Sequence, residues 1–209
     1  DIVFAGNLYF RSLSREVTLE QMQDIFSRTL YNFYKIGIGF NDAGIVDDFR
    51  SLSGLDLCVI LYDSELQMGK PRDERIDGVT LPPPEGIREE IDLHYSDDAI
   101  THNCCFVFPN VTRASLYRGI TMVQAVSSAV SHEIGHCYGA THVYDDRKFE
   151  LNRATRYIMA IKGYGKEFHP LNQERMRKLI LDVNTNGFDS SMVNRRRVES
   201  YQQNIFLDE

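Results

Sequence analysis

The chain has 209 residues, 43% of them hydrophobic and 25% charged, a balance typical of a folded protein with one sizeable domain. Its formal net charge of −7 argues against nucleic acid and acidic membrane surfaces as partners. No stretch approaches the roughly 18 to 20 apolar residues that a membrane-spanning helix needs, so we expect no membrane span.

The first 62 residues show clear strand and helix patterns. Residues 1–10 have strand character, interrupted at Gly6. Residues 18–34 predict an amphipathic helix, with Thr18 as N-cap and Gln21 placed to complete a capping box. We further expect a short strand over 36–40, a turn over 41–44, and a buried central strand over the nearly continuously apolar residues 55–62.

The later pattern begins with a long polar stretch, residues 63–98, which predicts a loop stiffened by three prolines. Strands are expected over 99–108 and 112–117, and helices over 121–138 and 171–183. This order of elements favours a mixed α/β sheet with helices packed on one face.

A dense cluster of histidines lies in the helix predicted over 121–138 and just beyond it. His132 and His136 are four residues apart, so 3.6 residues per turn places both on one helix face. Gly139 can end the helix in a left-handed conformation, and the chain can then return His142 as a third ligand. Three nitrogen ligands that leave a fourth position for water are the pattern of a catalytic zinc site.

Glu133 follows the first histidine and would project beside the metal. Zinc lowers the pKa of a bound water molecule and polarises a carbonyl group. Glu133 could then act as general base towards the water and as general acid towards a leaving amine. The pattern therefore predicts hydrolysis of peptide bonds. The remaining histidines, His94, His102 and His169, are assigned no role in metal binding.

With the motif HExxHxxGxxH, the chain resembles the metzincin zinc metallopeptidases. Residues 157–160, Tyr-Ile-Met-Ala, look like that clan's Met-turn, and Met159 follows His142 by 17 residues. This gap is similar to that of the adamalysin (reprolysin) family of snake-venom and ADAM-type enzymes, and within that family the resemblance extends to tick- and scorpion-venom relatives as a closer match. Val143 stands where that family has Asp, which affects the subfamily assignment more than the chemistry.

The resemblance implies a metzincin-like fold: a mostly parallel twisted sheet, a long active-site helix and a smaller, mostly helical C-terminal subdomain. The boundary would divide residues 1–139 from residues 140–209. The resemblance also implies one catalytic zinc ion, a protein or peptide substrate, a monomer and an extracellular location. Whether a calcium ion also binds is left open, because no residue supports it.

The resemblance further places the substrate between two chain segments. A rim strand within residues 99–105 would pair with the extended substrate, and residues 161–170 would shape the specificity pocket. The substrate-contacting residues expected on this basis are Ala99, Ile100, Thr101, His102, Ile161, Lys162 and Tyr164.

Two further features bear on an extracellular location. Asn110 opens an N-glycosylation sequon, which predicts a surface loop if the protein is secreted. Four cysteines permit two disulfides in three pairings, and the sequence does not choose among them: Cys58, Cys104, Cys105 and Cys137. Cys137 lies on the Glu133 side of the helix, which favours a structural thiol or disulfide over a fourth zinc ligand.

Two other functions are compatible with the motif. One is a binding or toxin protein built on a catalytically weak protease fold, and the other is a zinc amidase or deacetylase. The presence of Glu133 argues against the first, and the Met-turn residues argue against the second.

Overall fold

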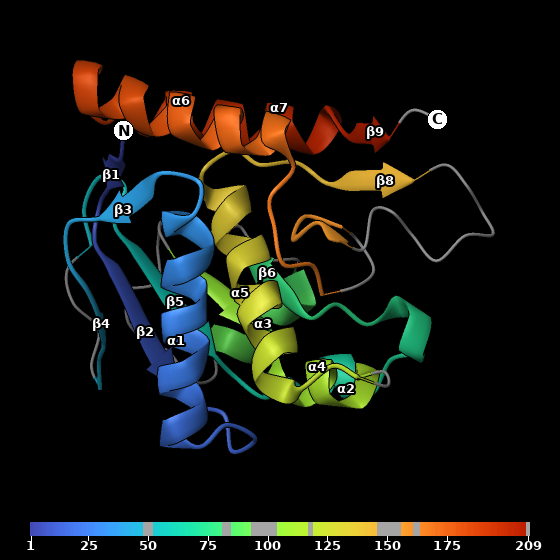
Figure 1. Cartoon of the computed structure of the whole chain (residues 1–209). Coiled ribbons are helices and arrows are strands. Elements are labelled where there is room, and N and C mark those ends of the chain that lie inside the picture. The colour runs from blue at the N-terminus through green and yellow to red at the C-terminus, as the bar shows by residue number, and fades with distance from the viewer. Residues whose placement is uncertain are drawn as a thin grey trace.

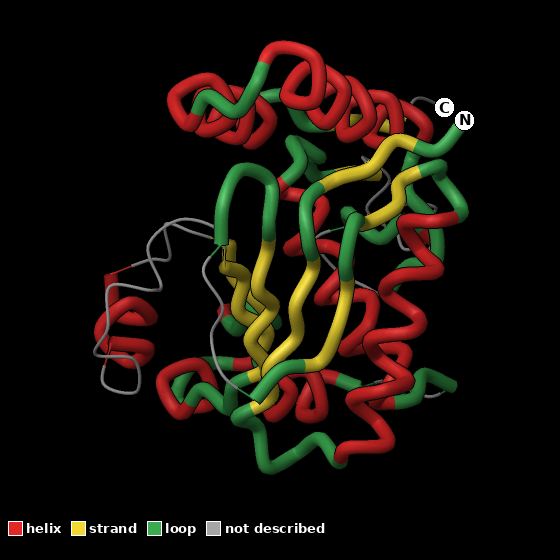
Figure 2. Tube along the Cα trace, turned by 90° about the vertical axis from the view of Figure 1, so that its left-hand side faces the viewer, coloured by secondary structure: helices red, strands yellow, loops and turns green. Residues whose placement is uncertain are grey.

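A five-stranded sheet forms the centre of the computed structural model, which describes residues 1–47, 52–80, 85–92, 104–116, 119–145, 156–160 and 164–207. In spatial order the strands are β4 (Ala43–Ile45), β2 (Leu8–Ser12), β5 (Leu57–Leu61), β7 (Cys104–Val107) and β6 (Gly78–Thr80). The first four run parallel and β6 runs antiparallel to β7. The strands lie side by side in the middle of the molecule (Figure 2). The mixed, mostly parallel sheet expected from the sequence is therefore confirmed.

Strand β5 is the central strand, as its apolar sequence predicted. All five of its residues are buried. Leu57, Val59 and Leu61 belong to the main hydrophobic core, whereas Cys58 and Ile60 face a smaller cluster on the other side of the sheet. A parallel strand that is covered on both faces needs apolar residues at consecutive positions, which explains the pattern.

Two long helices, α1 (Leu19–Tyr34) and α5 (Met122–Cys137), lie side by side over the main core (Figure 1). The predicted capping box of α1 is present, since the Thr18 hydroxyl accepts from Gln21 N and the Gln21 side chain accepts from Thr18 N. Helix α5 begins after Thr121, whose hydroxyl accepts from Gln124 N at 3.2 Å. Small residues along α5, such as Ala125 and Ser128, are buried and allow close packing.

Residues 63–98 are not the loop that the sequence suggested. They contain helix α2 (Glu65–Met68), the 3-10 helix η1 (Arg72–Glu74), strand β6 and helix α3 (Glu85–Asp92). These elements are only three to eight residues long, too short for a sequence period to be recognised. The three prolines, residues 82–84, lie outside the described residues.

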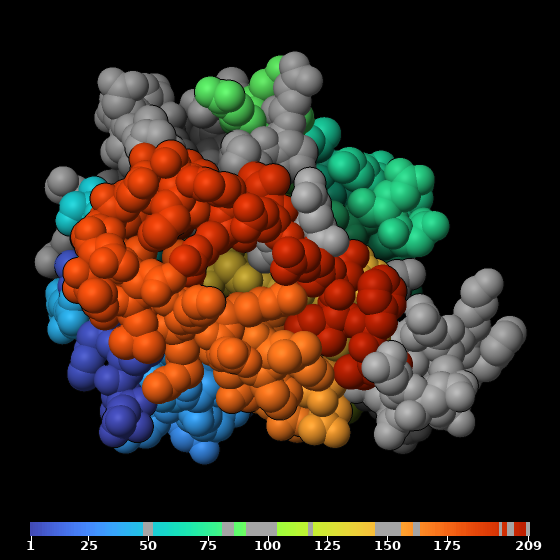
Figure 3. All heavy atoms as spheres, turned by 90° about the horizontal axis from the view of Figure 1, so that it is seen from above, coloured from blue at the N-terminus to red at the C-terminus, as the bar shows by residue number. Residues whose placement is uncertain are grey.

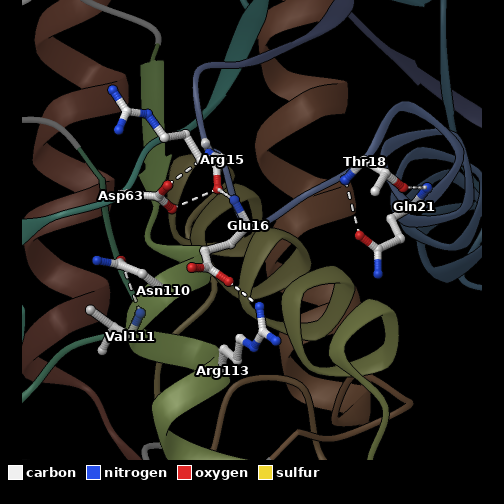
Figure 4. A network of polar contacts seen from close by, with 9 residues as sticks. Arg15, Glu16, Thr18, Gln21, Asp63, Asn110, Val111 and Arg113 are labelled. Carbon is white, nitrogen blue, oxygen red and sulfur yellow. Dashed lines mark hydrogen bonds and ion pairs between the residues drawn. The ribbon is translucent and has the colours of Figure 1, made fainter.

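The strand expected over 112–117 is also wrong, because residues 109–115 form helix α4 (Pro109–Ser115). Pro109 occupies the first turn, where its fixed φ and missing N–H suit a helix. Two polar contacts hold the segment before α1: Arg113 of α4 pairs with Glu16, and Asp63, which follows β5, accepts from Arg15 N (Figure 4).

Asn110 lies in the first turn of α4 rather than in the surface loop expected for a glycosylated residue. Its Oδ1 accepts from Ser64 N at 3.1 Å and from Val111 N at 2.9 Å, and its Nδ2 donates to Ser64 O at 3.2 Å. The nitrogen that would carry a glycan is therefore engaged in a contact within the fold.

The C-terminal part adds helices α6 (Pro170–Asn186) and α7 (Ser190–Gln202), which cover much of one face of the molecule (Figure 3). Helix α6 is longer than expected, and α7 was not predicted. Two small parallel sheets complete the described part of the chain: β1 (Val3–Ala5) pairs with β3 (Ile38–Phe40), and β8 (Val143–Asp145) pairs with β9 (Ile205–Leu207). The division between residues 139 and 140 stays a prediction. Within the described chain, no helix has the length and apolarity needed to cross a bilayer.

Candidate metal centre and active site

The last two turns of α5 carry His132 and His136 on one face, and a tight turn follows. Gly139 adopts φ +85°, a left-handed conformation that residues with a Cβ rarely adopt. Its N–H donates to His136 O at 3.0 Å, and Ala140 N donates to Gly135 O at 2.8 Å. These bonds end the helix and reverse the chain, which brings His142 back beside the helix face.

The three histidines converge through their Nε2 atoms. The Nε2 atoms of His132 and His142 are 3.2 Å apart, and each of the two pairs that include His136 is 3.1 Å apart. Two imidazoles bound at 2.0–2.1 Å to a tetrahedral zinc ion would have nitrogens about 3.3 Å apart, so this triangle fits one ion. Within the described residues, these three make up the group of side chains that could hold a metal.

Backbone carbonyls fix the orientation of two of the rings. His132 Nδ1 lies 2.8 Å from Ile158 O, and His136 Nδ1 lies 3.0 Å from Ala140 O. Because a carbonyl oxygen only accepts, each Nδ1 carries the proton and each Nε2 presents its lone pair to the shared point. This is the tautomer that a metal ligand needs.

Burial keeps the histidines neutral. Burial and then the nearby His142 lower the pKa of His132 to about 3. The same two causes, burial and neighbouring histidines, hold the pKa of His136 well below its usual value, and burial lowers that of His142. Neutral imidazole is the form that binds a metal, so the cluster is ready for an ion at neutral pH.

The residues that resemble a Met-turn, 157–160, form a tight turn beneath α5. Ala160 N donates to Tyr157 O at 3.1 Å, and Met159 is fully buried. A Cβ at Gly135 would lie 2.7 Å from the Met159 sulfur, so the turn approaches the helix where the helix lacks a side chain. Through Ile158 O, the same turn holds the His132 ring.

Glu133 is buried beside the histidines and is held by strand β6. The Thr80 hydroxyl donates to Glu133 Oε2 at 2.7 Å. Burial raises the pKa of Glu133 to about 8; the Thr80 hydrogen bond opposes this shift, and Cys137 and Asp77 add to it. A carboxyl group that binds a proton near neutral pH suits general base catalysis.

Several residues expected to contact substrate lie outside the described residues: Ala99, Ile100, Thr101, His102, Ile161 and Lys162. Tyr164 is described and is buried, and its hydroxyl donates to Asp77 Oδ2 at 3.2 Å. Asp77 directly precedes β6. Burial raises the pKa of Asp77, opposed by hydrogen bonds from Tyr164 and Thr112.

Of the rim strand expected within residues 99–105, only Cys104 and Cys105 belong to the described residues. They lie in β7, which is between β5 and β6 and is fully buried, so the strand expected over residues 99–103 stays a prediction. The edge of the described sheet beside α5 is β6, which lies in the range expected to be a loop. The run Val79-Thr80-Leu81, β-branched or apolar throughout, was the signal that could have found it.

The four cysteines are buried and form no disulfide with one another, so the expected disulfides are not present. Cys58 and Cys104 are directly paired in register across β5 and β7, and their thiols are in hydrogen-bond contact. Cys105 points to the opposite face, where its thiol contacts that of Cys137 on α5. Cys137 thus packs against the sheet, away from the histidine nitrogens.

Val143, which replaces the Asp expected from the resemblance, is a buried core residue that starts β8. Its N–H donates to Met159 O at 2.9 Å, and Ile205 N of β9 donates to His142 O at 2.9 Å. The peptide group that joins His142 to Val143 is therefore fixed by neighbouring segments at both its N–H and its C=O.

No protein-family model matches the chain, and no curated protein matches its sequence. Among solved structures, it is similar to archaemetzincin from Methanopyrus kandleri, at 11% identity and a TM-score of 0.49, over 85% of this chain and 96% of that one. It is also similar to metalloproteinase-II from Bacteroides fragilis, at 12% identity and a TM-score of 0.43, over 85% of this chain and 53% of that one. This chain thus corresponds to about half of the second protein.

Proposed function

We propose that this protein is a zinc-dependent endopeptidase of the metzincin type. One observation carries the proposal: the three histidine Nε2 atoms lie within 3.2 Å of one another, and the buried Glu133 directly follows His132 on helix α5. His132, His136 and His142 would hold the ion. When bound, zinc would supply a Lewis acid that polarises the scissile carbonyl and lowers the pKa of water.

The chain's own residues would supply the proton transfers and the fixed geometry. Glu133 would take a proton from the attacking water and later deliver it to the leaving amine. The hydrogen bonds to Ile158 O and Ala140 O keep two ligand rings in place during this transfer. The buried position of Glu133 keeps bulk water from competing for the proton.

A peptide substrate is favoured by the position of β6. This strand forms the edge of the described sheet next to the helix that carries Glu133. An extended peptide can add to such an edge through main-chain hydrogen bonds, as in other cases of strand addition. This position supports substrate pairing by strand β6; the pairing expected of residues 99–105 falls mostly on residues outside the described ones.

The adamalysin-side subfamily, the monomeric state and the extracellular location rest on the sequence resemblance alone and stay predictions. The 17-residue gap from His142 to Met159 supports the subfamily. The free thiols and the engaged Asn110 amide give no support to the disulfides or the glycan expected of a secreted protein.

The experiment is cleavage of an unfolded protein substrate by the zinc-loaded chain, compared with Glu133→Gln. We expect the variant to keep its zinc and to lose at least about 1,000-fold in rate, because it lacks the proton acceptor. A wild-type chain that holds zinc but cleaves no protein or peptide would contradict the proposal and favour a binding protein or an amidase. Equal rates for the two chains would exclude Glu133 as the base.

A further inference from the structure

Strand β6 contacts the Glu133 side chain at two of its three residues. Thr80 is buried, and its hydroxyl donates to Glu133 Oε2 at 2.7 Å. The same hydroxyl lies 3.3 Å from Glu133 O, so it contacts both the backbone and the side chain of this residue. A donor at this position fixes the carboxylate's rotation and engages one of its two oxygens.

Gly78, two residues before Thr80 on the same strand, lies beside Cγ and the other oxygen, Oε1, of Glu133. A Cβ at this position would lie 2.9 Å from Glu133 Cγ, 3.1 Å from Oε1, and 2.9 Å from the Phe106 carbonyl oxygen. The Phe106 oxygen is backbone of the central sheet and cannot move aside cheaply. A side chain at residue 78 would therefore displace Glu133.

Strand β6 is also held at its start. Asp77 O accepts from Phe108 N at 2.7 Å, and the Asp77 side chain accepts from Tyr164. The strand is paired in register with β7 from Gly78 to Thr80. Residues 78 and 80 are thus fixed relative to α5, which allows them to set the position of a side chain on that helix.

We propose that Thr80 and Gly78 are positioning residues for the general base: the Thr80 hydroxyl holds Oε2 of Glu133, and the bare backbone at Gly78 leaves the space that Cγ and Oε1 of Glu133 occupy. This inference rests on the proposed peptidase function and specifies how the base is oriented. The two oxygens then have separate tasks, since one is held by the protein and the other accepts the proton.

The decisive comparison is Thr80→Val against Thr80→Ser. Valine keeps the branched shape and removes the hydroxyl, whereas serine keeps the hydroxyl. We expect Thr80→Val to lower kcat by about 10- to 100-fold with KM nearly unchanged, the effect of losing a hydrogen bond to a charged group. Thr80→Ser should stay within about threefold of wild type. Zinc content and far-ultraviolet circular dichroism should match wild type in both.

A cycle with Glu133→Asp separates positioning from a general structural role. The shorter aspartate cannot reach the Thr80 hydroxyl in the same way, so adding Thr80→Val to it should change kcat by less than about threefold. If Thr80 had a purely structural role, Thr80→Val would lower kcat by the same factor in wild type and in Glu133→Asp. Thr80→Ala serves in the same comparison if the valine variant does not fold.

Gly78→Ala gives an independent test, with Gly44→Ala as its matched control. Gly44 lies on the opposite edge strand, β4, and a Cβ there meets nothing within 4 Å. We expect Gly78→Ala to lower kcat and Gly44→Ala to leave it unchanged.

The outcomes distinguish this inference from the proposed function. Suppose that wild type cleaves peptides and Glu133→Gln is inactive. If Thr80→Val then retains wild-type kcat, the positioning role is wrong but the proposed peptidase function still holds. If wild type with zinc is inactive, the proposed function itself fails.

Discussion

The Tyr164 hydroxyl donates to Asp77 Oδ2 at 3.2 Å and so joins two segments that are 87 residues apart. Tyr164 follows the turn beneath the histidines, and Asp77 leads into the edge strand that holds Glu133. This hydrogen bond links the segment below the candidate metal centre with the strand beside Glu133. Because Tyr164 is buried and Asp77 is partly buried, loss of this bond removes one of the two side-chain donors that Asp77 has among the described residues, Tyr164 and Thr112.

Replacement of this tyrosine by phenylalanine, Tyr164→Phe, is the first prediction. We expect it to lower the free energy of unfolding by about 1–2 kcal/mol at neutral pH, because the Asp77 carboxylate loses a donor while the ring still fills its site. Urea denaturation monitored by circular dichroism measures the change. An unfolding free energy equal to that of wild type would mean that the bond contributes no stability.

The loss of unfolding free energy in Tyr164→Phe should depend on pH. Burial raises the pKa of Asp77 above its usual value, and the Tyr164 bond opposes this rise. Without the tyrosine hydroxyl the folded-state pKa rises further, so the folded chain binds the proton more tightly than the unfolded chain does. Stability then falls as pH rises from about 4 towards the folded pKa, and the gap between wild type and variant widens over that range. Urea denaturation of both proteins at the two ends of this pH range tests whether the gap widens as pH rises.

Zinc should stabilise the folded chain through the three histidines. A ligand that binds only the folded state at about 100 times its Kd adds about 2.7 kcal/mol of stability. We expect zinc to raise the melting temperature of wild type, 1,10-phenanthroline to reverse the rise, and His142→Ala to abolish it. His169→Asn is the matched control, since His169 caps α6 by accepting from Leu171 N, a role that asparagine fills well. An unchanged zinc response in His142→Ala would exclude His142 as a ligand.

The sequence predicted the parts of the site that depend on local geometry. The positions of His132 and His136 follow from the helical period, and the return of His142 follows from the left-handed turn at Gly139. The partner of Glu133 could not be predicted in the same way. Thr80 is 53 residues away, in a strand of three residues that is too short to show a period.

The fold shows the same contrast. The long helix α1 and the buried strand β5 are each recognisable from their own residues, through a capping box and a continuous apolar run. Helix α7 is polar over most of its surface, so its sequence has little helical pattern. The thiol contacts depend on the register between β5 and β7 and on the packing of α5, both set by residues far apart in the chain.

Gly135→Ala should disturb the metal centre through Met159. A Cβ at residue 135 would lie 2.7 Å from the Met159 sulfur and 3.2 Å from the Phe168 ring. We expect a loss of about 1–3 kcal/mol in unfolding free energy, typical of overpacking, together with weaker zinc binding. The second change Met159→Ala should recover part of the loss in the double variant. Additive losses in the double variant would show that the clash lies elsewhere.

The four thiols should react slowly in the folded protein. All are buried, and a hydrogen bond with a neighbouring thiol, together with burial, raises the pKa of Cys104 and of Cys105. Alkylation needs an exposed thiolate, so iodoacetamide should modify none of the four at pH 8 within minutes and all four in denaturant. Mass spectrometry of the intact chain counts the adducts. Rapid labelling of the native chain would contradict the buried arrangement.

The last prediction concerns the C-terminal strand and the third histidine. Ile205 N donates to His142 O at 2.9 Å, and β9 pairs with β8 from Val143 onwards. Ile205→Pro removes this donor, so the backbone that carries His142 loses a fixed partner. We expect zinc affinity to fall by about tenfold, the effect of a lost contact that orients a ligand, whereas Ile205→Val should bind zinc as wild type does. Competition with a chromophoric chelator gives both affinities. If the proline variant bound zinc as tightly as the valine variant, His142 would be held without help from β9.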